Sequence, residues 1–251
     1  MKKTSLIIGG ASGIGRCLYK ITSENEKVII WDKKKIQNKA VDVTSEKLIL
    51  KEIYYLKKKK IKLDNIFICH GVHHSTPLID MNLKELKNVF ESNFFSYFLI
   101  IKHIRSILNK NAKIIAISSI SACTPIPYSS SYSSSKAALE ALYFSYKNEE
   151  RNFFPVIVQP GNVNTGFNET GNNYKKFNSQ YFKKYKNILD KINSKFGMDP
   201  NLVAEKIYTI SQKKKPKFKY IIGKNAILAN IAKRILGDEI TLKLLKYYFK
   251  I

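Results

Sequence analysis

Short apolar runs rich in β-branched residues alternate along this chain with longer stretches that have helical periodicity. The runs are continuous in apolar character, which is typical of parallel strands that helices cover on both faces. Strands alternating with helices over this length predict an α/β fold with a doubly wound parallel sheet, a three-layer α/β/α arrangement of the Rossmann type. The expected strands are residues 5–9, 27–31, 65–69, 113–118, 155–159 and 219–223, and the clearest expected helices are 83–108 and 135–150.

Length and cysteine use indicate one domain in a reducing compartment. A chain of 251 residues, 44% of them hydrophobic, fits a single domain over residues 1–251. Cys17, Cys69 and Cys123 are scattered and odd in number, as reduced thiols of a cytoplasmic protein would be. The apolar run near the N-terminus ends at Ile8, too early for a signal peptide. No later segment has the length of a membrane span, so we expect no transmembrane segment.

The formal net charge of +25 raises the possibility of a polyanion-binding protein. Almost all of this charge is lysine, whereas phosphate and base recognition favours the planar fork of arginine. The lysines are also spread along the whole chain, as solvated helix ends and loops would be. We therefore expect no nucleic-acid partner. A catalytically degenerate binding protein that uses this basic surface for polyanions is the alternative to an enzyme.

The first expected strand runs directly into a glycine-rich turn, “IIGGASGIGR”. Gly9, Gly13 and Gly15 there allow a tight turn, close approach of a pyrophosphate to the backbone, and a helix whose N–H groups face an anion. The spacing is G-x-x-x-G-x-G and differs from the common G-x-G-x-x-G pattern, so it is a weak signal alone.

Asp32 ends the second expected strand, 17 positions after Gly15 (32 − 15 = 17). An acidic side chain at this point meets the 2′-hydroxyl of an adenosine ribose and repels a 2′-phosphate. Asp32 therefore favours NAD over NADP. The lysines at 33–35 weaken this inference, because one of them could accommodate a phosphate, and Asp32 could also be only a turn residue.

The stretch “PYSSSYSSSKAALEAL” contains two tyrosines and one lysine. Residues four apart share a helix face, which places Tyr132 beside Lys136, and a nearby ammonium lowers the pKa of a phenol. Tyr132 is therefore the candidate general acid and base. Tyr128 has no lysine four positions on, so we expect it to line the approach to the site or to pack.

Two further segments end strands at the edge where ligands bind in such sheets. Ser119 follows the apolar strand “KIIAIS”, 13 residues before Tyr132 (132 − 119 = 13). Downstream, “QPGNVNTGF” has a turn at Pro160 and Gly161, with Thr165 placed near a cofactor.

Together these motifs resemble the short-chain dehydrogenase/reductase family, from about residue 5 to at least residue 223. The resemblance implies an NAD(P)-dependent oxidoreductase that acts on the CH–OH group of a small secondary alcohol, or on the corresponding ketone, and needs no metal. Its catalytic tetrad corresponds to Asn93, Ser119, Tyr132 and Lys136. The cofactor contacts that it implies are Gly9, Ser12, Gly13, Ile14, Gly15, Asp32, Asp42, Val43, Gly71, Tyr132, Lys136, Pro160, Gly161, Val163 and Thr165.

The resemblance also implies a role for each tetrad residue. Tyr132 exchanges a proton with the substrate oxygen while hydride passes between substrate and nicotinamide. Lys136 holds the nicotinamide ribose and lowers the pKa of Tyr132. Ser119 orients the substrate oxygen, and Asn93 supports a proton-relay water beside Lys136.

The chain departs from the family pattern in two places. Ile8 stands before the first glycine, where threonine is usual, and the family's N-N-A-G stretch is replaced by residues 68–71, “ICHG”. The loss of both amides should alter the hydrogen bonds that steady the central sheet and the cofactor ribose. His73 and His74 nearby have no acidic partner at ligand spacing, so we expect no metal and place one of them near the substrate entrance.

The last third of the chain holds the expected substrate lid, at about 166–198, and a helical tail at about 225–251 that breaks near Gly237. The tail could cover the substrate pocket, lie on a membrane surface or form a subunit contact, and we expect it simply to pack against the domain. The lid is rich in aromatic residues, which suits an apolar substrate but also simple packing. The family resemblance implies a homodimer or homotetramer through helices 83–108 and 132–150. A sugar-nucleotide epimerase or dehydratase also uses a Tyr-x-x-x-Lys pair, but this chain looks too short for that class.

Overall fold

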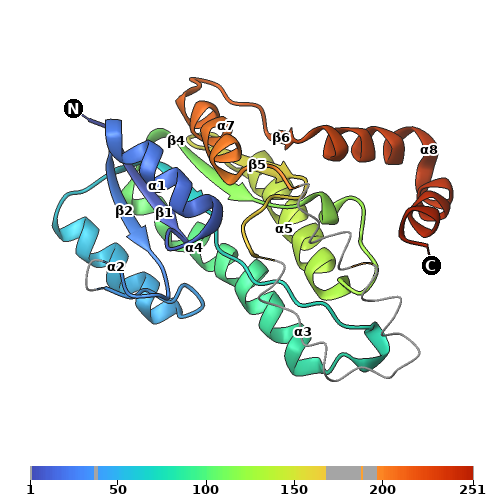
Figure 1. Cartoon of the computed structure of the whole chain (residues 1–251). Helices are drawn as coiled ribbons and strands as arrows, with labels where there is room; N and C mark the ends of the chain where they lie inside the picture. Colours follow the sequence, from blue (N-terminus) through green and yellow to red (C-terminus); the bar gives the residue numbers. More distant parts are fainter. Residues whose placement is uncertain (1, 37–38, 168–187, 189–196, 251) are drawn as a thin grey trace.

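A parallel sheet forms the centre of the computed structural model, which describes residues 2–36, 39–167, 188 and 197–250 (Figure 1). The strand order is β2-β1-β3-β4-β5-β6, and all neighbouring strands are parallel. The prediction of a doubly wound sheet from the six apolar runs is confirmed. The strands are β1 (Thr4–Ile8), β2 (Lys27–Trp31), β3 (Leu63–Ile68), β4 (Leu108–Ile117), β5 (Phe154–Pro160) and β6 (Lys219–Ile222).

Helices cover both faces of this sheet. On one face α1 packs beside α7, and on the other α2 packs beside α4 and α3 beside α5. Alternate residues of each strand point to opposite faces, so that Leu6 and Ile8 join one buried cluster and Ile7 joins the other. The helices are α1 (Gly13–Asn25), α2 (Glu46–Lys58), α3 (Leu83–Phe90), α4 (Ser96–Ile104), α5 (Ser130–Glu149), α7 (Pro200–Gln212) and α8 (Lys224–Phe249).

The helix expected over residues 83–108 is not one regular helix. A π-helical turn at Glu91–Phe95 separates α3 from α4, and residue 108 already belongs to β4. Periodicity does not show an extra residue in a helical turn, because the apolar stripe continues through it. The turn contains Asn93, whose side chain is tied to another loop as described below.

The expected C-terminal tail forms α8, which continues beyond β6 and away from the sheet (Figure 1). Gly237 interrupts it with φ of 71°, so the predicted break near this residue is confirmed. In the part of the chain that the structure describes, no helix is both long and apolar enough to cross a membrane. Most of the expected lid, including Tyr174, Phe177, Tyr181 and Phe182, lies outside the described residues.

Candidate active site

The turn from β1 to α1 brings backbone into close contact. A Cβ at Gly15 would lie 2.1 Å from the carbonyl oxygen of Gly9, and one at Gly9 would lie 2.6 Å from the amide nitrogen of His70. Gly9 and Gly13 also have left-handed φ values of 85° and 52°. Ser12 precedes α1 without a side-chain cap, and Ile14 lies in the first turn of that helix. Glycine is therefore required for this turn, which opens a helix N-terminus at the carboxyl edge of the sheet.

Asp32 follows β2 beside the glycine turn. Its Oδ2 accepts a hydrogen bond from the Ala11 amide at 2.9 Å, and its Oδ1 accepts one from the Lys34 amide at 2.8 Å. The three side chains at 33–35 are exposed. The Asp32 carboxylate thus lies against the glycine turn at the end of β2, and the exposed lysines at 33–35 follow it in the chain.

Asp42 and Val43 lie on the loop that leads into α2. Asp42 Oδ1 accepts hydrogen bonds from the amide of Thr44 at 2.9 Å and from its hydroxyl at 2.8 Å. Asp42 is exposed, whereas Val43 is buried in the core. The amide of Val41 donates to the Asp32 carbonyl at 2.7 Å, so this loop runs next to the end of β2.

The loop after β5 closes over the glycine turn. Gly161 follows Pro160 and donates its amide to Ile222 at 2.9 Å, which fixes the loop to β6. Val163 forms a bridge with Met198. The Thr165 side chain then lies so close to Gly13 that a Cβ there would be 3.3 Å from the Thr165 Cβ. The two segments that the sequence assigned to a cofactor therefore meet.

Tyr132 and Lys136 lie one turn apart in α5, facing the end of β4. Lys136 is buried, and its Nζ donates to the carbonyl of Ile117 at 2.9 Å and lies 5.9 Å from the centre of the Tyr132 ring. A hydrogen bond with Ser119, which caps the short turn after β4, acts on the Tyr132 phenol. The tetrad residues Ser119, Tyr132 and Lys136 are thus brought together.

The pKa of Tyr132 differs from the expectation. Burial raises the pKa of Tyr132 to about 12, and the hydrogen bond with Ser119 lowers it. Burial also lowers the pKa of Lys136 to about 8, while Cys69 and Glu140 raise it. The predicted lowering of the Tyr132 pKa by Lys136 is therefore wrong for this structure. The ammonium is held by the Ile117 carbonyl, and desolvation of the phenol has the larger effect.

Asn93 ties the loop after β3 to the helices beneath it. Its Oδ1 accepts from the Val72 amide at 2.8 Å, and its Nδ2 donates to the Val72 carbonyl at 2.9 Å and to Ser135 Oγ at 3.1 Å. Gly71 lies between Asn93 and Lys136, since a Cβ there would be 3.1 Å from Asn93 Oδ1 and 3.7 Å from Lys136 Nζ. The amide group thus positions the loop that borders the lysine.

His70 follows the two positions, Ile68 and Cys69, at which the family pattern has amides, and it stands where that pattern has alanine. Its Nε2 is 2.7 Å from Ser96 Oγ, and its ring packs on Tyr97 at a centroid distance of 4.7 Å. Burial, followed by the charge of Lys136, lowers the pKa of His70 to about 3, so the ring is neutral. The side chain therefore still provides a polar link between the loop after β3 and α4.

His73 lies directly against the tyrosine of the site, a contact that the sequence did not predict. The residue is 6% exposed, and its ring lies edge to face against Tyr132, with centroids 5.0 Å apart. Its Nε2 lies 3.2 Å from Ser129 Oγ, and its Nδ1 is buried without a hydrogen-bond partner among the described residues. Burial lowers the pKa of His73 to about 4. The sequence placed His73 or His74 near the substrate entrance, but spacing alone could not choose between them.

Two smaller expectations concern neighbouring residues. Tyr128 has a left-handed φ of 63°, and its carbonyl accepts a hydrogen bond from the Thr76 amide at 2.8 Å. It therefore helps to shape the loop before α5. His74 turns to Thr76, with its Nε2 2.8 Å from Oγ1. Among the described residues, no three histidine, cysteine or acidic side chains are grouped as metal ligands.

A glycine turn, an acid after the second strand and a Tyr-Lys pair lie on one edge of the sheet, an arrangement typical of dinucleotide-dependent oxidoreductases. The family described as short chain dehydrogenase matches residues 3–176, so the chain belongs to this family. Its members include ketoreductases, and the protein is an enzyme of this class, acting on CH–OH or keto groups with NAD(P).

The relatives include two bacterial reductases and a solved structure. The chain is 26% identical to the 3-ketodihydrosphingosine reductase of Bacteroides thetaiotaomicron over 87% of each chain. It is 32% identical to the 3-oxoacyl-[acyl-carrier-protein] reductase FabG of Buchnera aphidicola over 70% of this chain and 68% of that one. A short chain dehydrogenase from Burkholderia cenocepacia in complex with NADP has the same fold, with a TM-score of 0.74, 16% identity and 96% of each chain covered.

Replacing Asn93 by alanine should loosen the loop after β3. The change leaves the amide and carbonyl of Val72 without their side-chain partner, and an unsatisfied buried group costs about 1–3 kcal/mol. We expect the free energy of unfolding in urea to fall by that amount and hydrogen exchange at Val72 to speed up. Asn88→Ala, an exposed position on α3, is the control. Unchanged protection at Val72 would contradict this role of Asn93.

Proposed function

We propose that the protein transfers a hydride between NAD and a secondary alcohol or its ketone, with Tyr132 as general acid and base. The observation that carries this proposal is the half-buried Tyr132 side chain, hydrogen-bonded by Ser119 and flanked by Lys136. In the reducing direction, Tyr132 donates its proton to the carbonyl oxygen as hydride reaches the carbonyl carbon. In the oxidising direction, the same oxygen accepts the hydroxyl proton.

The residues present fit a nicotinamide dinucleotide. The turn at Gly9, Gly13 and Gly15 leaves room where side chains would fill it, and the N-terminus of α1 offers amides to the pyrophosphate. Lys136 would hold the nicotinamide ribose, and Thr165 the nicotinamide end. When bound, the nicotinamide supplies or accepts the hydride, and the protein contributes orientation and the proton.

A preference for NAD is supported by Asp32, whose carboxylate lies against the glycine turn and would repel a 2′-phosphate. The exposed lysines at 33–35 are the feature that would favour NADP. The Burkholderia relative is described in complex with NADP. The next experiment therefore measures both cofactors.

Fluorescence titration should show tighter binding of NADH than of NADPH. Asp32→Ala should reduce the ratio of the two Kd values about tenfold or more, because a hydrogen bond to a charged group contributes about 1.5–3 kcal/mol. Asp80→Ala, which removes an exposed acid elsewhere, is the matched control. Equal affinities in the wild type, or a ratio that Asp32→Ala leaves unchanged, would contradict the NAD preference.

An apolar substrate is supported by the surroundings of Tyr132. The Phe167 ring lies 5.8 Å from the Tyr132 ring and 6.1 Å from His73, between centroids. One of the relatives is named as a reductase of the ketone 3-ketodihydrosphingosine. We propose a substrate whose alcohol or keto group sits on an apolar chain, and a series from 2-butanol to 2-dodecanol is the first panel to test.

The pH profile of alcohol oxidation tests the role of Ser119. Tyr132 must be deprotonated to accept the hydroxyl proton, and the pKa of about 12 predicts a rate that rises with pH between about 7 and 10. Ser119→Ala removes the hydrogen bond that lowers this pKa, so its profile should shift to higher pH. Tyr132→Phe should lower kcat about 10²–10⁴-fold without a comparable loss of NADH binding.

Ser134→Ala is the control for this profile, because Ser134 is exposed on the same helix and bonds the Ser130 carbonyl. Its pH profile should match the wild type. If Ser119→Ala leaves the rate of alcohol oxidation unchanged at every pH between about 7 and 10, Ser119 does not act through the Tyr132 proton.

His73 supplies a polar contact to the substrate in this proposal. A neutral imidazole with a buried, unpartnered nitrogen beside the general acid suits a hydroxyl or amide near the reacting carbon. His73→Phe keeps a ring of similar size and should raise KM about 2–10-fold for substrates with a second polar group, the range of one hydrogen bond. Kd for NADH should stay the same.

Two further variants make this test specific. His73→Gln keeps a donor and an acceptor and should recover part of the lost affinity, whereas His74→Phe changes a neighbour that turns to Thr76. Equal KM changes in His73→Phe and His74→Phe would overturn the assignment of His73 to the substrate.

A further inference from the structure

Exposed apolar side chains gather on α8. Of the 20 large hydrophobic side chains that are exposed among the described residues, 10 belong to this helix of 26 residues. We call Lys224–Phe249 the α8 arm. Exposed apolar surface of this density marks an interaction site. The exposed residues are Ile227, Leu228, Ile231, Ile235, Leu236, Ile240, Leu242, Leu244, Tyr247 and Tyr248.

In the first half of the arm, polar side chains face the domain and apolar side chains face solvent, which is the reverse of the usual arrangement. Ala226, Asn230 and Lys233 share the face that packs on the domain, where Asn230 Nδ2 donates to Gln159 Oε1 at 2.8 Å and Lys233 Nζ donates to the Cys123 carbonyl at 2.7 Å. The Ile231 and Ile235 side chains lie on another face, 49% and 74% exposed. A helix that serves only its own domain buries its apolar stripe. This one presents it to solvent.

The positive charge of the α8 arm indicates which kind of partner its apolar face contacts. The arm and its C-cap carry six cationic residues, against Asp238 and Glu239. A second copy of a chain with net charge +25 would bring like charges together, whereas an anionic lipid surface complements them. The cationic residues are Lys224, Lys233, Arg234, Lys243, Lys246 and Lys250.

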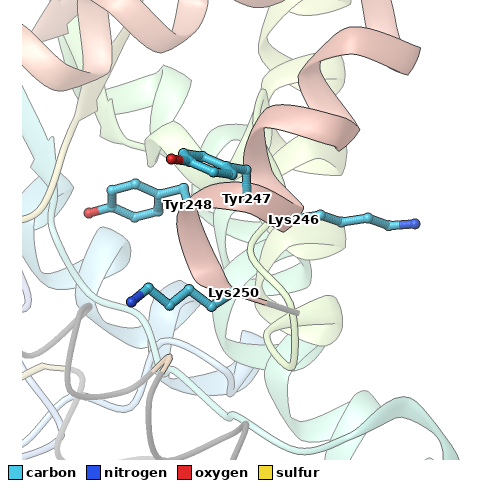
Figure 2. Close-up of a pocket in the computed structure, with 4 residues that line it drawn as sticks. All are labelled: Lys246, Tyr247, Tyr248 and Lys250. Carbon is cyan, nitrogen blue, oxygen red and sulfur yellow. The ribbon is translucent and has the colours of Figure 1, made fainter.

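The end of the arm combines aromatic and basic side chains around a surface hollow (Figure 2). Tyr247 and Tyr248 are 86% and 59% exposed, and their phenol groups point to the same side as the Lys250 amine, with Lys246 on the opposite side. Tyrosine is enriched where membranes meet water, and lysine stems extend along apolar surface while their amines reach polar headgroups. This composition fits the headgroup region of a bilayer.

We propose that the α8 arm binds the protein to an anionic membrane surface, lying in the plane of the bilayer with its apolar face inserted. Amphipathic helices bind in this way through apolar burial together with attraction of lysines to anionic lipids. The break at Gly237 allows the two halves of the arm to take different directions. This association goes beyond the proposed reaction and does not rest on it.

Cosedimentation of the full-length protein with vesicles tests the proposal. Vesicles of phosphatidylcholine alone are compared with vesicles that contain one third phosphatidylglycerol, and the protein should partition strongly only to the second. The triple variant Leu228→Ser, Ile231→Ser, Ile235→Ser should partition at least about tenfold less, because each side chain loses apolar burial. Lys243→Glu with Lys246→Glu should weaken partitioning at least about 25-fold, at roughly fivefold for each lysine lost.

Matched controls lie on other helices and turns. Leu78→Ser with Ile79→Ser removes apolar side chains that are 72% and 78% exposed. Lys57→Glu with Lys58→Glu makes the same change in net charge at the end of α2. Both controls should bind anionic vesicles like the wild type. Circular dichroism and NADH titration confirm that every variant is folded.

Three outcomes would overturn the proposal. The first is equal binding to neutral and anionic vesicles. In the second, the arm variants bind as well as their controls. The third is a wild type that binds neither vesicle and, by light scattering, forms an oligomer that the triple variant dissociates, because the arm is then a contact between copies. Since none of these readouts uses turnover, a failure here is distinct from a failure of the proposed reaction.

Discussion

A lysine buried at the end of β4 sets the conditions for the rest of the site. Lys136 is 3% exposed, lies 5.2 Å from the centre of the Tyr97 ring, and donates to the Ile117 carbonyl. A buried ammonium is costly unless it is hydrogen-bonded, and desolvation is the cause that lowers the pKa of Lys136 to about 8. The end of β4, which supplies the carbonyl, and α5, which supplies the lysine, must therefore keep a fixed relative position. The same relative position of α5 and β4 places Tyr132 beside Ser119.

The two histidines near this lysine are suited to its charge because both are neutral. Burial lowers the pKa of His70 to about 3 and that of His73 to about 4, and Lys136 adds to the effect at His70. A protonated ring beside a buried ammonium would add repulsion to desolvation. His70 thus links the loop to Ser96 as a neutral group, as an amide would. Of Lys136, Tyr132 and the two histidines, Lys136 with its pKa of about 8 is the group whose charge changes between pH 6 and 9.

Local sequence signals were enough to predict the sheet, the glycine turn and the shared helix face of Tyr132 and Lys136, whereas the full tetrad came from the family resemblance and stays a prediction. Six apolar runs match six strands, and the spacing of Tyr132 and Lys136 puts them on one helix face. Three features depend on tertiary packing, and the sequence did not reveal them. The first is the π-helical turn, which contains the Asn93 side chain that hydrogen-bonds Val72. The second is the edge-to-face contact between His73 and Tyr132, which come from different segments of the chain. The third is the raised pKa of Tyr132, which burial causes. The short local patterns of the sequence contain none of these contacts.

Lysine has two opposed uses in this chain, and the contrast explains why net charge alone was a poor guide to function. Lys136 is held in the interior by a carbonyl, and its charge acts over a few ångströms. The lysines of the α8 arm lie on a helix whose apolar side chains face solvent. In the proposed membrane complex, the charge of these lysines therefore acts together with insertion of the apolar side chains into the bilayer. A +25 chain without such a helix would attract any polyanion weakly. The reversed polarity of α8 turns this general attraction into an interaction with a surface that is both anionic and apolar.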